Sequence, residues 1–169
     1  MRFQLAAKLG GLLPVLLILA ACSSSGKLEL IQSKSASIPP GKTVSLIVKS
    51  YQDEDSVRMV QRLRGELFGR LVSEAIFKQV LHPKEKGDYA MEVQVLKAEV
   101  VSQGARIFFG VLAEANKLRC SVKLVDQVTG RLVTNFNVEG QSASHPFSTE
   151  NGLDDAVREV VTNMIVALR

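Results

Sequence analysis

The chain has 169 residues, enough for one domain of ordinary size, with 46% hydrophobic and 22% charged residues. This balance excludes disorder over most of its length. The formal net charge is +4, but part of it comes from the N-terminus. Cleavage before Cys22 would remove Arg2 and Lys8 and leave 19 basic residues against 17 acidic ones. No basic run is interleaved with aromatic residues, so we expect no nucleic-acid partner.

The first 21 residues have the architecture of a secretory signal peptide. Arg2 and Lys8 form its basic region, and the nearly uninterrupted apolar stretch 9–21 is too short for a spanning helix with polar flanks. Leu19-Ala20-Ala21-Cys22 resembles the lipobox of bacterial lipoproteins. The resemblance implies that Cys22 becomes an S-diacylglycerol and N-palmitoyl cysteine at the mature N-terminus. The alternative is an ordinary secretory signal with an incidental cysteine.

The residue after the cysteine indicates which membrane holds the anchor. In Gram-negative lipoproteins an aspartate at this position usually causes retention in the inner membrane, whereas this chain has Ser23. We therefore expect the acylated Cys22 to hold the protein in a lipid bilayer, on the periplasmic face of the outer membrane. Each buried acyl methylene contributes about 0.8 kcal/mol, so several chains give a lasting anchor.

Residues 22–42 are rich in Ser, Lys and Gly and predict a lipidated N-terminus followed by a flexible tether. Within them, the short apolar piece 28–31 is a candidate edge strand. We expect the folded domain over residues 43–169, facing the periplasm. Its first strand carries Val44, Leu46 and Val48 in alternation with polar residues.

A long helix is predicted next. Acidic residues at 53–55 offer N-caps, and we expect the helix to reach Leu81, where His82-Pro83 stops it. Gly65 and Gly69 on this helix indicate tight packing against a sheet or a slight break. The expected buried stripe consists of Val57, Val60, Leu63, Leu67, Leu71, Ala75 and Ile76.

Residues 88–102 predict a long strand whose apolar positions change phase. One face would carry Tyr89, Met91, Val93 and Val95, and the other Leu96, Ala98 and Val100. Because a slip of one residue turns every later side chain to the opposite face, we predict a β-bulge or strong bend near Val95-Leu96.

The second half of the chain predicts a hairpin and a closing helix. Residues 117–126 form the first strand, 126–130 the turn with Gly130 at positive φ, and the next strand carries Leu132, Phe136 and Val138. The inward residues of the first strand are Leu118, Cys120, Val122 and Leu124. Residues 151–169 form an amphipathic helix that carries Leu153, Ala156, Val157, Val160, Val161, Met164, Ile165 and Leu168. The order β-α-β-β-β-α predicts an α+β fold with a single sheet, antiparallel or mixed, and both helices on one face.

Groups that often carry chemistry are sparse. With Cys22 acylated, Cys120 has no intrachain partner, and we expect it to be a buried apolar side chain rather than a reactive thiol. His82 and His145 are far apart in sequence and show no metal-ligand spacing. The acidic residues 53–55 could bind a cation, but helix capping explains them. We expect no catalytic residues, no metal and no cofactor, and hence no enzyme.

The segment 106–115 is strongly apolar although it connects two predicted strands. One hypothesis makes it an interaction segment for a protein or membrane partner, with Phe108, Phe109, Val111 and Leu112 as its contact residues. The other places it in the core as strand and hairpin.

The chain resembles a family of bacterial lipoproteins known as domain of unknown function 4410. The residues that carry the resemblance are the lipobox at Cys22, the extended segment around Asp88-Tyr89-Ala90, the hairpin 122–132 and the apolar helix from Asn151. It covers about residues 43–168. The family implies a lipoprotein and assigns no activity.

We expect a non-enzymatic, membrane-anchored lipoprotein that acts as an adaptor or structural component of the cell envelope and binds an envelope protein. The alternative is a carrier or sensor of a small apolar or lipid ligand, with a pocket between the sheet and the helices.

Overall fold

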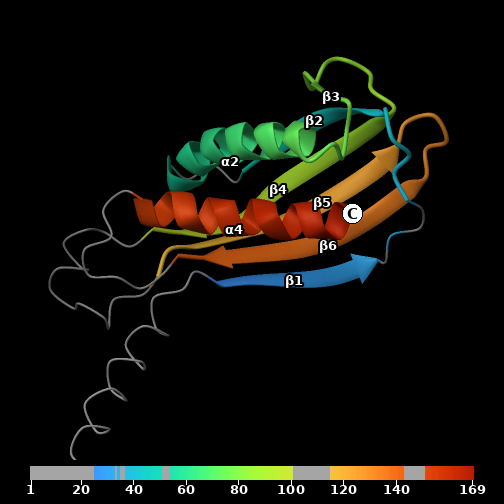
Figure 1. The fold of residues 1–169 in the computed structure, drawn as a ribbon. Coiled ribbons are helices and arrows are strands. Elements are labelled where there is room, and N and C mark those ends of the chain that lie inside the picture. Colours follow the sequence, from blue (N-terminus) through green and yellow to red (C-terminus); the bar gives the residue numbers. More distant parts are fainter. Residues whose placement is uncertain (1–24, 33, 35–36, 51–53, 101–114, 143–150) are drawn as a thin grey trace, which may run out of the picture.

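The structure is a computed structural model that describes residues 25–32, 34, 37–50, 54–100, 115–142 and 151–169. Six strands form one mixed sheet, and two helices lie side by side on one face of it (Figure 1). The predicted α+β fold with both helices on one face is therefore confirmed. The elements are β1 (Ser25–Gln32), β2 (Thr43–Lys49), α2 (Glu54–Ser73), β3 (Gln79–Leu81), β4 (Tyr89–Glu99), β5 (Lys117–Asp126), β6 (Leu132–Gln141) and α4 (Asn151–Leu168).

The strands lie in the order β1-β6-β5-β4-β2-β3. The pairs β1–β6, β6–β5 and β5–β4 are antiparallel, whereas β2 is parallel to both β4 and β3. At one end of the sheet the register places Ser25, Gln141, Lys117 and Glu99 in a row across four strands. We call this the Ser25 end. The opposite end, where the turn between β5 and β6 lies, is the hairpin end.

Strand β1 corrects the expected domain boundary. Residues 25–32, which we assigned to the tether, form an edge strand of eight residues that pairs with β6, so the folded domain begins at least as early as Ser25. The apolar piece 28–31 is part of this strand, as predicted. Just after it, Lys34 Nζ donates to the carbonyls of Leu168 and Arg169, at 2.7 and 3.0 Å, and so caps the C-terminus of α4.

Helix α2 ends at Ser73, so the prediction that it reaches Leu81 was wrong. Ala75 takes a left-handed conformation with φ of 53°, and the N–H of Ile76 donates to the carbonyl of Leu71, as in a Schellman C-cap. Residues 79–81 then pair with β2 as the short strand β3. The buried stripe also differs, because Val57 is 51% exposed and Met59 takes its place in the core.

The predicted bulge in β4 is confirmed. The register against β5 shifts between Val95 and Lys97, and Leu96 turns outward while Val95 stays buried. Strand β4 ends at Glu99 rather than at residue 102.

The hairpin and the last helix follow the sequence pattern. Strand β5 has the predicted bounds, and Leu118, Cys120, Val122 and Leu124 are buried. In the turn, Asp126 Oδ1 accepts the N–H groups of Val128 and Thr129, both at 2.8 Å, and Gly130 has a φ of 70°. Every predicted apolar residue of α4 is buried except Leu153, which is half-buried.

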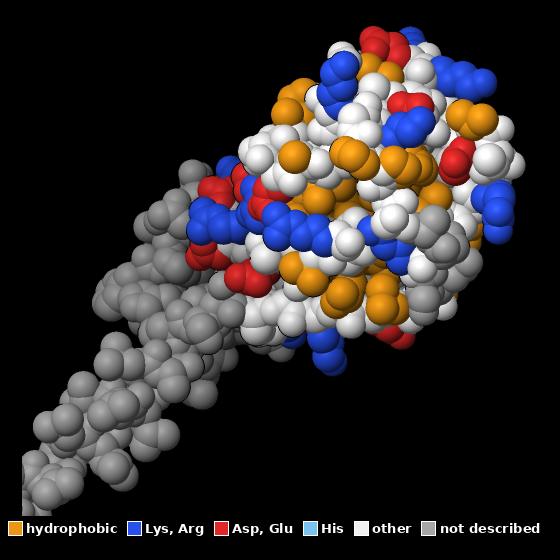
Figure 2. Space-filling model, turned by 45° about the vertical axis from the view of Figure 1, so that its right-hand side comes forward, with side chains coloured by type: hydrophobic (Ala, Val, Ile, Leu, Met, Phe, Trp, Pro, Cys, Tyr) orange, Lys and Arg blue, Asp and Glu red, His pale blue; other side chains and the backbone are white. Residues whose placement is uncertain are grey.

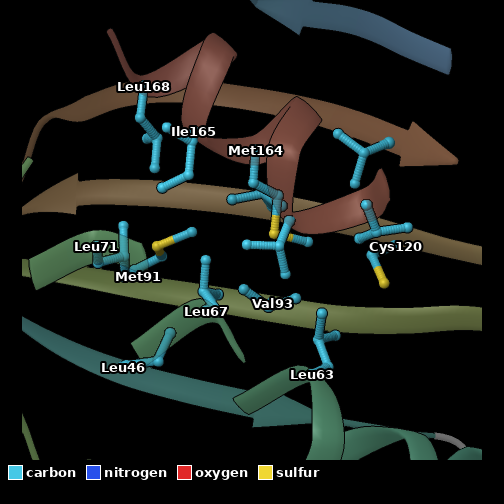
Figure 3. Packing of buried hydrophobic residues seen from close by; sticks show 14 of the residues in the cluster. Leu46, Leu63, Leu67, Leu71, Met91, Val93, Cys120, Met164, Ile165 and Leu168 are labelled. Atoms are coloured by element: carbon cyan, nitrogen blue, oxygen red, sulfur yellow. The ribbon is translucent and has the colours of Figure 1, made fainter. Parts of the chain in front are cut away.

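The core fills the space between the sheet and the two helices (Figure 3). Leu63, Leu67 and Leu71 of α2 and Met164, Ile165 and Leu168 of α4 meet side chains of the sheet, among them Leu46, Met91, Val93 and Cys120. The two helices also contact each other, and Arg62 of α2 forms an ion pair with Asp154 in the first turn of α4.

The space around three glycines shows where a helix packs closely on the sheet and where it does not. A Cβ at Gly140 of β6 would collide with the backbone of α4, at Ala156 O and at 2.8 Å from Val160 N. By contrast, a Cβ at Gly65 or Gly69 of α2 would meet nothing within 4 Å. Of the two explanations offered for Gly65 and Gly69, tight packing against the sheet is therefore absent, and the close approach lies at Gly140 instead.

This contrast predicts opposite effects for one chemical change. Gly140→Ala should lower the free energy of unfolding by about 1–3 kcal/mol, because the helix backbone must move to admit the methyl group. Gly65→Ala should raise it by about 0.5–1 kcal/mol, because glycine in an exposed helix interior is less favourable than alanine. Urea unfolding followed by circular dichroism measures both. Equal effects of the two substitutions would contradict the packing described here.

Asp88 ties the strands together at the hairpin end. Its Oδ2 accepts the backbone N–H and the hydroxyl of Thr43, both at 2.8 Å, and its Oδ1 accepts Lys42 Nζ at 3.0 Å. Its carbonyl accepts the N–H of Gln127 in the turn at 2.8 Å. The hydrogen bonds from Thr43, followed by that from Lys42, lower the pKa of Asp88 from 3.8 to about 2.

A lowered carboxyl pKa in the folded state stabilises the protein above pH 3.8, and this contribution disappears as the pH falls toward 2. Asp88→Asn should therefore lower the stability at neutral pH and reduce its fall over that acidic range. Urea unfolding of both proteins at a series of pH values tests this. The same fall in the variant as in the wild type would show that Asp88 is not the group responsible.

Candidate interaction surface

The face of the sheet opposite the helices carries charged side chains near the Ser25 end. Residues two apart on a strand share a face, and Leu118 and Cys120 of β5 point to the core, so Lys117 and Arg119 point the other way. The register extends this set across four strands. We call the following residues the charged surface: Lys27, Glu29, Lys97, Glu99, Lys117, Arg119 and Glu139.

Ion pairs link neighbouring strands on the charged surface. Arg119 Nη2 lies 3.5 Å from Glu29 Oε2, and Lys117 Nζ lies 3.8 Å from Glu99 Oε2. Lys97 also pairs with Glu99, and its hydrogen bond lowers the pKa of that carboxyl. Because these side chains reach solvent, each pair contributes little to stability. The surface is thus a polar platform with four cations and three carboxylates.

Open depressions lie on this platform. One, of about 390 Å³, is lined by Lys27, Glu29, Arg119 and Glu139 together with Leu28, Asn137 and Val138. Another, of about 230 Å³, is lined by Lys97, Glu99, Lys117, Arg119 and Glu139. Charged walls and an open form suit contact with a polar surface better than enclosure of an apolar ligand.

The sequence patterns did not reveal the charged surface as a unit. Each strand shows the alternation that places its polar residues on one face, but the seven residues come from four strands. Only the cross-strand register, including the shift at Val95 and Lys97, brings them together. The register between strands that are distant in sequence cannot be read from the pattern within any one strand.

Several predicted site residues lie outside the described residues. They are Cys22, the interaction segment Phe108, Phe109, Val111 and Leu112, and also Asp53 and His145. The segment's described neighbours, Val100 and Ala115, follow β4 and precede β5 at the Ser25 end.

Cys120 lies in the core, as predicted for an apolar side chain (Figure 3). It is fully buried, and burial raises the pKa of its thiol, which disfavours the reactive thiolate. His82 is exposed, and its Nδ1 accepts the N–H of Lys84 at 3.3 Å. Over the described part of the chain, no group of three or more His, Cys, Asp or Glu side chains is placed to hold a metal ion.

Helix α2 presents apolar side chains that the sequence pattern had not placed on the surface. Val57, Phe68 and Val72 are each about half exposed. On the face shown in Figure 2, apolar side chains stand in small groups among Lys, Arg, Asp and Glu side chains. Among the described helices, none is both long and apolar enough to cross a membrane.

Solved structures share this fold. PelC from Paraburkholderia phytofirmans, solved as a dodecamer, matches with a TM-score of 0.56 at 14% identity, over 86% of this chain and 98% of that one. Protein XCC0632 from Xanthomonas campestris matches with a TM-score of 0.54 at 12% identity, over 83% and 88%. The lipoprotein GNA1162 from Neisseria meningitidis matches with a TM-score of 0.46 at 13% identity, over 75% and 99%. At 14% and 12% identity, the likeness to PelC and to XCC0632 extends to the fold alone.

No curated protein matches the chain. A family model does match, over residues 29–146, which is more than half of the chain and reaches from β1 past the end of β6. The chain therefore belongs to the family described as domain of unknown function DUF4410.

Proposed function

We propose that this protein is a bacterial lipoprotein, acylated at Cys22, that serves as a non-enzymatic adaptor or structural component of the cell envelope. Its domain is held on the periplasmic face of the outer membrane. There it binds an envelope protein.

The observation that carries the proposal is a lipobox that stands only three residues ahead of a residue paired into the sheet. The lipobox sets a cleavage site directly before Cys22, and the first described strand begins at Ser25, three residues later. Cleavage at this site leaves β1 and all the later elements in the mature chain. Because β1 completes the sheet beside β6, the lipidated residue leads straight into the folded domain.

The roles of the reactive side chains support a non-enzymatic protein. Cys120 is buried in the core, and Asp88 accepts hydrogen bonds that link neighbouring strands. The carboxylates of Glu29 and Glu99 form ion pairs with basic side chains. Each of these groups is therefore either buried or already paired with a neighbouring side chain or backbone group. A polar platform beside a lipid anchor suits a contact surface.

The alternative, a carrier of an apolar ligand, requires space between the sheet and the helices. Large side chains fill this space, among them Phe77, Phe136 and Met164, each of which is almost fully buried. The packing therefore favours the adaptor over the carrier.

Metabolic labelling with a fatty-acid analogue tests the anchor, and the two cysteines of the chain provide a matched comparison. We expect label on the wild type and on Cys120→Ala, and none on Cys22→Ser, because only Cys22 stands in the lipobox. Membrane fractionation should place the labelled protein in the outer membrane. A mature protein that begins at another residue, or carries no acyl mass on its first residue, would refute the anchor.

Cross-linking in intact cells tests the adaptor role. The lipidated protein should yield a discrete cross-linked species with an envelope protein, and Cys22→Ser should lose it, because the variant without acyl chains is not held at the outer membrane beside its partner. An anchored wild type that yields no such species would contradict the adaptor role and leave the lipid anchor intact.

A further inference from the structure

We propose that the Ser25 end of the sheet rests against the phospholipid headgroups, with the hairpin end directed away from the bilayer. This inference rests on the proposed acylation of Cys22 and names the surface that the anchor brings to the membrane. The length of chain between Cys22 and β1 carries it, and the charges at the Ser25 end support it.

The link between the anchor and the domain is short. Ser25, the first residue of β1, follows Cys22 by three residues. A fully extended chain spans at most about 3.3–3.6 Å per residue, so Ser25 lies within about 11 Å of Cys22. With its acyl chains in the hydrocarbon core, Cys22 lies in the headgroup layer, which is roughly 5–7 Å deep on each side of the core. Even fully extended, the link therefore keeps Ser25 within about 11 Å of the headgroup layer, so the Ser25 end stays close to the bilayer surface.

The direction of β1 sets which parts of the domain lie far from the membrane. From Ser25 the strand runs for eight residues toward the hairpin end, a length of about 25 Å at the usual rise of a strand. The turn between β5 and β6 and the C-terminal Arg169 lie at that far end (Figure 1). Gln141, Lys117 and Glu99 lie in a row with Ser25 and share its closeness to the anchor.

The chemistry of the charged surface suits the headgroup layer. Lys27, Lys97, Lys117 and Arg119 lie within the first rows of the sheet at the Ser25 end. Long basic side chains can keep their stems on the protein and place their charge at lipid phosphates. Lys27 forms no ion pair with any described residue, which leaves its ammonium group available to a phosphate.

Because the chain contains no tryptophan, single tryptophans can report the distance to the membrane. Val100 at the Ser25 end and Val128 at the hairpin end are both exposed, so Val100→Trp and Val128→Trp are the same change at opposite ends. Ile31→Trp places a third probe on the edge strand, away from Ser25. Each lipidated full-length variant is reconstituted into vesicles of phosphatidylethanolamine and phosphatidylglycerol that carry a nitroxide on the headgroup. Circular dichroism checks that each variant is folded.

We expect the tryptophan at 100 to lose most of its emission and those at 31 and 128 to lose little. Equal quenching at 100 and 128 would overturn the orientation. Quenching at 31 as strong as at 100 would overturn it too, because β1 would then run parallel to the bilayer surface.

Co-sedimentation of the wild type and of Cys22→Ser with the same vesicles separates the two proposals. If the wild type does not bind, or if Cys22→Ser binds equally well, the lipid anchor itself fails. If the wild type alone binds but the probes do not differ, only the orientation fails.

Discussion

The close contact between α4 and β6 is the constraint on which the rest of the domain depends. At Gly140 the helix backbone lies where a side chain would otherwise be, so α4 rests directly on the sheet. In this position the apolar stripe of α4 covers Cys120 and Val138, and Asp154 of α4 lies beside Arg62 of α2. Gly140 thus sets the distance between α4 and the sheet, and α4 closes the core over β1, β5 and β6 while α2 covers β2, β3 and β4.

Elements with strong local signals could be predicted from the sequence. The hairpin shows alternating apolar residues around an Asp-to-Gly turn, and α4 repeats apolar residues at helical spacing, so both were placed within a residue or two. The bulge in β4 was also predictable, because the change in apolar phase at Val95-Leu96 has a direct geometric meaning. In each case the physical cause lies within a few residues of its effect.

The features that escaped prediction depend on distant partners or on an unusual residue. Helix α2 ends at a C-cap in which Ala75 occupies a position that usually holds glycine, so the sequence carries no stop signal there. Strand β1 extends beyond the predicted apolar piece 28–31, because its polar N-terminal residues also pair with β6. The charged surface needs the register of four strands at once. The anchor and the segment around Phe108 are predictions outside the described residues.

The pairing of β1 has a consequence for the order of events during the export that we propose. Ser25 pairs with Gln141, so almost the whole domain separates the two strands in sequence. In a chain that crosses the membrane N-terminus first, β1 has no neighbour to pair with until β6 has emerged. Closing so long a loop is a late step in folding. The acylation that we propose at Cys22 can therefore precede the pairing of Ser25 with Gln141.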